Sequence, residues 1–179
     1  MFSRGLMSRV DIMIGIIGSG KSTLAKELAQ EFDATILSSD AIRKELFDGG
    51  KLPEEHGFRS NQIVYGELRR RFEELLKIGK NVILDGLNTT KREQYFAITS
   101  RYDCYVTGRL LLTDKKICIQ RVIERERRDP NIHKVEDPEK TIFFSERAIR
   151  NNFPSLDEGF DELVIYKNNI ISSVEKRER

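Results

Sequence analysis

The sequence predicts an α/β domain in which a five-stranded parallel sheet carries helices on both faces. Short apolar runs alternate along the chain with segments of helical periodicity. The runs are continuously apolar, which is typical of strands that are covered on both faces. Strand and helix in alternation indicate right-handed β–α–β units, and such units build parallel sheets. Because 179 residues suffice for one core, we expect a single three-layer domain over residues 1–179.

The elements can be placed from apolar periodicity and from the turn residues that flank it. Strands are expected at residues 10–16, 34–37, 82–84, 104–112 and 163–165. Helices are expected at residues 20–31, from 39 onward, and at 61–78, 91–102, 114–128 and 139–151. Ligands of parallel sheets bind beyond the carboxyl ends of the strands, so the polar residues at those ends are the candidate site.

The composition is that of a globular protein, with 39% apolar and 34% charged residues. A net charge of +2 does not by itself require a nucleic-acid partner. No apolar run approaches the roughly 20 residues of a membrane span, and the first residues lack a secretory signal. Cys104 and Cys118 have no Cys or His at metal-ligand spacing, which is typical of reduced thiols. We therefore expect a cytoplasmic protein without a membrane partner.

Residues 15–22, Gly-Ile-Ile-Gly-Ser-Gly-Lys-Ser, match the phosphate-binding pattern G-x-x-x-x-G-K-[ST] at every position. Glycines let successive N–H groups turn toward phosphate oxygens, and the helix that follows points its positive end at the same anion. We expect Lys21 to reach the β- and γ-phosphates of ATP and Ser22 to ligate Mg²⁺. The residues expected to contact the nucleotide are Gly15, Gly18, Ser19, Gly20, Lys21, Ser22 and Thr23. The loop alone leaves open whether the γ-phosphate goes to water, goes to an acceptor or is retained.

Two carboxylates follow the neighbouring strands. Asp40 lies three residues before Arg43, so the two share a helix face, where a base could take an acceptor's proton and an Arg could hold its anion. The alternative is that Asp40 only caps the helix and pairs with Arg43. Asp85 ends another strand, a position suited to the water shell of a metal or to a phosphate-binding Arg. Its alternative is a cap in the turn of residues 85–89.

The helix at 114–128 carries three arginines at i, i+4 and i+7, which places them on one face: Arg121, Arg125 and Arg128. Such a face before a Pro-containing segment suits a short lid, over about residues 121–138, that closes on the transferring phosphate. A solvated helix with ion pairs to Glu124 and Glu126 would have a similar pattern. The run Arg69–Arg71 instead favours a solvated helix face, because consecutive residues cannot face one ligand.

Together these motifs resemble the kinase domain of polynucleotide 5′-kinases and related small P-loop kinases. The resemblance runs from about residue 11 to 167 and includes a Pro…Glu-Gly-Phe segment at 154–160. It implies a three-layer P-loop NTPase fold that transfers the γ-phosphate of ATP to a hydroxyl, in the polynucleotide case the 5′-OH of DNA or RNA.

The resemblance also implies a role for each matching residue. Asp40 would be the general base, Arg43 would hold a phosphate of the acceptor, and Arg125 would stabilise the transferring phosphoryl group. Lys21, Asp85, Arg121 and Arg128 would serve the nucleotide and its metal.

Three functions remain open from the sequence. The first is a kinase of polynucleotide 5′-OH ends, against which the weak basicity counts. The second is a small-molecule kinase of the same fold, with a nucleoside, sugar or antibiotic acceptor. The third is a nucleotide hydrolase or switch without an acceptor. Asp40 and Arg43 count against the third, because a site that activates water has no use for an Arg that holds an acceptor's phosphate.

Overall fold

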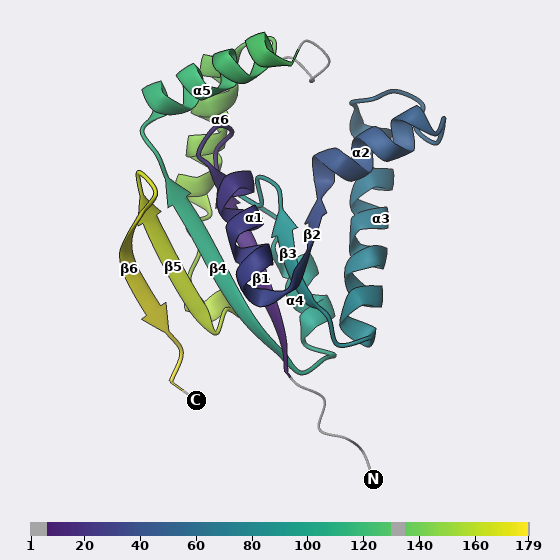
Figure 1. The fold of residues 1–179 in the computed structure, drawn as a ribbon, viewed down its shortest axis with the longest axis vertical. Coiled ribbons are helices and arrows are strands. Elements are labelled where there is room, and N and C mark those ends of the chain that lie inside the picture. Colours follow the sequence, from purple (N-terminus) through teal and green to yellow (C-terminus); the bar gives the residue numbers. More distant parts are fainter. Residues whose placement is uncertain (1–6, 130–134, 179) are drawn as a thin grey trace.

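The structure, a computed structural model, describes residues 7–129 and 135–178, and its strands form one six-stranded sheet (Figure 1). The order across the sheet is β2-β3-β1-β4-β5-β6. The first five strands are parallel, as expected, and β6 runs antiparallel to β5. The strands are β1 (Ser8–Gly15), β2 (Ala34–Ser38), β3 (Asn81–Asp85), β4 (Cys104–Leu112), β5 (Glu162–Lys167) and β6 (Ile170–Lys176).

The expected five-stranded sheet is therefore wrong by one strand. Asn168 and Asn169 both have positive φ, 49° and 68°, and form a two-residue turn that folds β6 back onto β5. Nearly every residue of β6 is exposed, and its sequence lacks the continuous apolar run by which the other five strands were predicted. The Asn-Asn dipeptide was the available signal, because Asn tolerates positive φ better than most residues.

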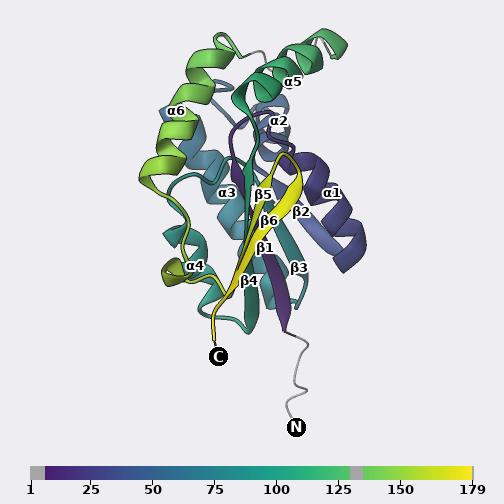
Figure 2. The ribbon, with the colours of Figure 1, turned by 90° about the vertical axis from the view of Figure 1, so that its left-hand side faces the viewer.

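Helices cover both faces of the sheet, which gives the expected three layers. Figure 2 shows α1 on one face and α3, α4 and α6 on the other, with α5 across the upper end of the sheet. The helix α3 begins three residues before its expected start, and α4 is shorter than expected. The helices are α1 (Lys21–Phe32), α2 (Ser39–Asp48), α3 (Phe58–Lys77), α4 (Glu93–Thr99), α5 (Lys115–Arg128), α6 (Pro138–Asn151) and the 3₁₀ turn η1 (Leu156–Glu158).

The sheet separates two apolar cores, and β1 contributes to both. Its residues Val10, Ile12 and Ile14 enter the larger core with α3, whereas Met13 packs beneath α1. All four side chains are fully buried. The two-sided burial explains why the strand reads as a continuous apolar run rather than an alternating one.

Two expectations from composition can be compared with the structure. None of the helices in the described ranges combines the length and the apolar character that crossing a bilayer requires. Cys104 and Cys118 are both free thiols, and Cys118 is buried.

Residues 130–134 of the expected lid lie outside the described residues.

Candidate active site

The phosphate-binding loop joins β1 to α1, and its glycines are required by the backbone geometry. Gly18 has φ 76°, and a Cβ at this position would lie 2.5 Å from the carbonyl oxygen of Cys118. Gly20 is the N-cap of α1 with φ 99°, and no side chain caps the helix there. The N–H groups of this helix terminus therefore face the loop uncapped, as anion binding at a helix N-terminus requires.

Lys21 lies folded over this loop and is only 7% exposed. Its ammonium donates to the carbonyl oxygen of Ile16 at 2.6 Å and to the Ser19 hydroxyl at 3.4 Å. Burial lowers the pKa of Lys21 from 10.5 to about 8, and the negative charges of Asp85 and Asp40 oppose this shift. The cation is thus held at the loop by a neutral carbonyl, a contact that a phosphate oxygen can replace.

Asp85 ends β3 beside the loop, and only 8% of it is exposed. Burial raises the pKa of its carboxyl, while a hydrogen bond with Ser22 and the nearby Lys21 charge lower it. A Ser hydroxyl and a carboxylate are hard oxygen donors of the kind that Mg²⁺ prefers. The turn after β3 is tied instead by Asn88, which donates to the carbonyl oxygens of Met13 and Leu84.

Asp40 is the second residue of α2, and it is not the cap of that helix. The N-cap is Ser38, whose hydroxyl accepts from the Ala41 N–H at 3.3 Å. Within the described part of the chain, no hydrogen bond or ion pair engages the Asp40 carboxylate. The alternative in which Asp40 caps the helix and pairs with Arg43 does not hold in the structure.

Arg43 is a buried cation that is held by neutral groups. It is 7% exposed, and its guanidinium donates to the Glu55 carbonyl oxygen at 3.1 Å and to the Asn61 amide oxygen at 2.8 Å. Its Nε is buried and has no acceptor among the residues described. No carboxylate of residues 7–129 or 135–178 forms an ion pair with it. A buried cation without a counter-ion is characteristic of a site that receives an anionic ligand.

These groups surround one cavity of about 400 Å³ at the carboxyl end of the sheet. In Figure 1, α2 and α5 lie on opposite sides of the phosphate loop, and residues of both helices line the cavity. The expected residues that line the cavity are Gly18, Gly20, Lys21, Ser22, Thr23, Asp40, Arg43, Asp85, Arg121 and Arg125. Ser38, Ser39, Gly86 and Leu87 also line it, from the strand ends at which the site was expected. The lining residues that the sequence did not reveal are His56, which its polar surroundings favoured as a surface residue, and Tyr65.

The arginines of α5 do not all reach this cavity. Arg121 donates to the Gly18 carbonyl oxygen at 3.3 Å, and Arg125 lines the cavity. Arg128 lies outside it, with 81% of its side chain exposed and an ion pair to Glu124 at 3.5 Å. The stripe at i, i+4 and i+7 therefore divides into two residues at the cavity and one at the solvent.

Two residues of the phosphate loop lie behind the cavity rather than on its wall. Gly15 packs against Leu111, where a Cβ would lie 3.0 Å from a carbonyl oxygen. Ser19 is fully buried, and its carbonyl oxygen accepts from the Thr113 hydroxyl at 2.9 Å. The end of β4 therefore supports the loop from behind, through the contacts of Leu111 with Gly15 and of Thr113 with Ser19.

The arginines of α3 form ion pairs on the helix surface. Arg70 pairs with Glu67 and Glu74, and Arg71 pairs with Glu45 and Glu67. This confirms the ion-paired face for Arg70 and Arg71. Arg69 differs, because it is half-buried and donates to the side-chain amide oxygen of Gln94 in α4 at 2.5 Å.

A second cavity, of about 320 Å³, adjoins the first and shares Gly20, Thr23 and Arg121 with it. Tyr166 of β5 and Asn169 of the following turn complete its wall. The phosphate loop therefore opens on two sides, which leaves room for a nucleotide to extend past the phosphates toward β5.

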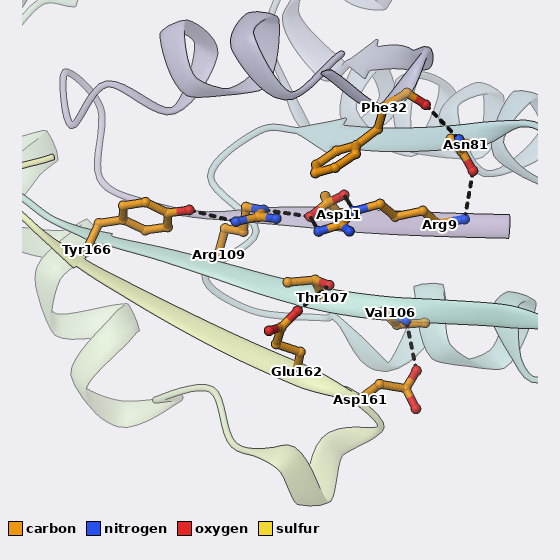
Figure 3. A network of polar contacts seen from close by, with 10 residues as sticks. All are labelled: Arg9, Asp11, Phe32, Asn81, Val106, Thr107, Arg109, Asp161, Glu162 and Tyr166. Atoms are coloured by element: carbon orange, nitrogen blue, oxygen red, sulfur yellow. Dashed lines mark hydrogen bonds and ion pairs between the residues drawn. The ribbon is translucent and has the colours of Figure 1, made fainter. Parts of the chain in front are cut away.

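A buried polar network holds Tyr166 in place (Figure 3). The Arg109 guanidinium donates to the Tyr166 hydroxyl at 2.6 Å and to the Asp11 carboxylate at 2.5 Å. Asp11 also pairs with Arg9 at 2.7 Å. The network crosses from β1 through β4 to β5 beneath α1, so the wall of the second cavity is anchored to the centre of the sheet.

The family AAA_33, described as an AAA domain, matches residues 10–142. The chain belongs to the AAA_33 family. The match covers the phosphate loop, both carboxylates of the cavity and all of α5.

Curated relatives match less than half of this chain. An uncharacterized protein of Mycobacterium tuberculosis is 38% identical over 86 residues, which are 44% of this chain and 17% of that protein. An adenylate kinase of Vanderwaltozyma polyspora is 32% identical over 87 residues, which are 44% of this chain and 39% of that enzyme. The chain thus spans less than half of the length of either relative.

Solved structures with the same fold extend over most of the chain. A provisionally assigned kinase from Chloroflexus aurantiacus matches with a TM-score of 0.69 at 18% identity, over 90% of this chain and 89% of that one. A chain of the Pnkp1/Rnl/Hen1 RNA repair complex matches with a TM-score of 0.64 at 19% identity, over 82% and 45%. A shikimate kinase from Bacteroides thetaiotaomicron matches with a TM-score of 0.57 at 18% identity, over 92% and 88%. The AAA_33 domain of this chain therefore has the fold of P-loop kinases, as the resemblance implied.

Proposed function

We propose that the protein is an ATP- and Mg²⁺-dependent phosphotransferase whose acceptor is the 5′-OH of a polynucleotide. The fold of P-loop kinases implies a nucleotide substrate. The cavity joins the phosphate loop to Asp40 and Arg43, which can serve an acceptor. The observation that carries the acceptor assignment is Arg43, a buried cation that lines the same cavity as the phosphate loop and has no counter-ion among residues 7–129 and 135–178.

The nucleotide half of the proposal uses both cavities. The phosphates of ATP would lie on the loop, with Lys21 at the β- and γ-phosphates. The adenine ring would extend into the second cavity, between Arg121 and Asn169. Ser22 and Asp85 would hold Mg²⁺, which supplies charge neutralisation to the phosphates when it is bound. Arg125 would stabilise the γ-phosphoryl group as it transfers, because its helix borders the same cavity.

The acceptor half uses α2. Asp40 would take the proton of the 5′-OH, the freed oxygen would bond to the γ-phosphorus, and the bond from that phosphorus to the ADP oxygen would break. Arg43 would hold the phosphate on the 3′ side of the same nucleotide. The lack of a protein partner for the Asp40 carboxylate in the described chain suits a base, because the base must be available to the acceptor.

A small-molecule kinase of the same fold is the second candidate, and two observations favour it. The cavity between the phosphate loop and Arg43, at about 400 Å³, has the volume of a small-ligand site. The matched relative from V. polyspora is an adenylate kinase. The RNA repair complex among the structural neighbours favours the polynucleotide, since that assembly acts on RNA by its name.

The experiment compares two acceptors that differ in one phosphate. With γ-labelled ATP, a nucleoside 3′-phosphate should be phosphorylated at its 5′-OH with a kcat/KM roughly ten- to a hundredfold above that of the plain nucleoside, the range expected of a charge-assisted Arg–phosphate contact. Arg43→Ala should erase the difference, and Arg43→Lys should restore part of it, because a point charge cannot replace the planar guanidinium. Equal rates for both acceptors in the wild type would overturn the polynucleotide assignment and favour the small-molecule kinase. Release of inorganic phosphate without any labelled acceptor would favour a hydrolase.

A further inference from the structure

The hydrogen bonds that hold the Arg43 guanidinium go to neutral oxygens, so they do not neutralise its positive charge. Of the carboxylates on α2 and at the middle of α3, Glu45 and Glu67 pair with the arginines of α3, and Asp48 pairs with Lys44. Asp40 lines the same cavity as Arg43, but among the described residues it forms no ion pair with it. In the described part of the chain, the hydrogen bonds of the Arg43 guanidinium go to two neutral oxygens, the main-chain carbonyl of Glu55 and the side-chain amide of Asn61. Neutral acceptors fix the orientation of a guanidinium without neutralising it.

Asn61 is the only side chain among the described residues that holds Arg43. It lies in the first turn of α3, and its amide oxygen is 2.8 Å from Nη2 of Arg43. Asp would have the same shape at this position, would reach the same nitrogen and would form an ion pair with it. An ion pair is the stronger contact, so selection for helix packing alone would be met at least as well by Asp.

We propose that Asn61 is a positioning residue of the acceptor site, which orients Arg43 through a neutral oxygen so that the full guanidinium charge is kept for an anion on the acceptor. This inference rests on the proposed function, because the anion is the phosphate beside the 5′-OH. Arg43 has five N–H donors, of which the protein occupies two, and its buried Nε is among those left over. The acceptor phosphate would satisfy part of this remaining capacity.

The test is Asn61→Asp, measured with the nucleoside 3′-phosphate and with the plain nucleoside. We expect the KM for the 3′-phosphate acceptor to rise roughly tenfold, since the new carboxylate competes for the charge-assisted contact. The kcat at saturating acceptor, the KM for ATP and the rate with the plain nucleoside should stay unchanged. The melting temperature should not fall, because an ion pair replaces a neutral hydrogen bond.

The matched control is Gln62→Glu, which adds the same charge on the adjacent exposed residue of α3. It should leave both acceptors unaffected. Asn61→Ala removes the hold without adding charge, so its effect on the 3′-phosphate KM should be smaller than that of Asn61→Asp. If Asn61→Asp does not fold, an unchanged preference for the 3′-phosphate in Asn61→Ala overturns the proposal.

The outcomes separate this inference from the function on which it rests. If the wild type prefers the 3′-phosphate acceptor and Asn61→Asp keeps that preference, Asn61 has only a packing role and the inference fails alone. If Gln62→Glu raises the KM as much as Asn61→Asp, the effect is one of general charge and the inference fails. If the wild type shows no preference, the acceptor assignment and this inference fail together.

Discussion

Lys21 should destabilise the nucleotide-free protein, because its ammonium charge is buried at the phosphate-binding loop. At neutral pH the lysine is protonated in the folded and in the unfolded chain. A fall in pKa from 10.5 to about 8 corresponds to about 3 kcal/mol of unfavourable free energy in the folded state. Lys21→Met removes the charge and keeps the approximate shape. It also removes the hydrogen bond to Ile16, whose net contribution is about 1 kcal/mol, so we expect a gain in stability of about 2 kcal/mol at pH 7.

The pH dependence has a definite sign. Because the folded pKa is below the unfolded one, the penalty is fully present below about pH 8 and disappears as the pH rises toward 10.5. In that window the unfolded chain binds a proton that the folded protein has released, so the wild type gains stability with rising pH. Lys21→Met lacks this gain, and the difference between the two proteins should narrow above pH 8.

Urea denaturation at pH 7 and at pH 9.5 measures both effects. Lys26→Met is the control, an exposed lysine on the same helix whose removal should change stability by less than about 0.5 kcal/mol. A Lys21→Met protein that is less stable than the wild type at pH 7, or whose difference from it does not change with pH, would refute the reasoning. Saturating ATP analogue should reverse the order, because only the wild type gains the phosphate contact.

Three further predictions concern the loop, the sheet and the acceptor base. Gly18→Ala should abolish nucleotide binding measured by calorimetry, because its Cβ would lie 2.5 Å from the Cys118 carbonyl oxygen and the residue has φ 76°. The control is Gly66→Ala in α3, where the Cβ would meet open space, and its effect on protein stability should be neutral or favourable. Nucleotide binding by Gly18→Ala would contradict the loop geometry. Asp11→Asn should lower the free energy of unfolding by about 3 kcal/mol, because Arg109 would become a buried unpaired cation. The control is Asp48→Asn in an exposed ion pair, which should change the free energy of unfolding by less than about 1 kcal/mol. Equal effects of the two substitutions in urea denaturation would exclude a special role for the buried pair. Asp40→Asn should lower kcat by about 10²- to 10⁴-fold with an unchanged melting temperature and KM for ATP, and an active but less stable variant would show that Asp40 is structural.

Most of the fold could be predicted because burial leaves a pattern in the sequence. The central strands β1, β3 and β4 are buried on both faces, so each reads as a continuous apolar run, and β3 has a polar residue, Asp85, at its end. The strand β6 could not be found in this way, because it is an exposed edge strand that depends on the Asn168–Asn169 turn.

The site divides along a similar line. The phosphate-binding loop consists of eight consecutive residues, 15–22, so its chemistry can be predicted from the sequence motif alone. His56, Asn61 and Tyr65 come from the connection between α2 and α3 and from the start of α3, where no motif marks them, and only the fold places them beside Arg43. Likewise, the helical period placed Arg128 with Arg121 and Arg125, but at the end of α5 its guanidinium pairs with Glu124.

The most direct test of the central claim is the identity of the group that receives the phosphate. Wild-type protein would be incubated with γ-labelled ATP, Mg²⁺ and a panel of 5′-OH oligonucleotides of DNA and RNA, plain nucleosides and aminoglycosides, beside Lys21→Ala as the inactive control. We predict label at the 5′ end of an oligonucleotide, and none with Lys21→Ala. Label that appears only in a small molecule, or only as inorganic phosphate, would contradict a polynucleotide 5′-kinase.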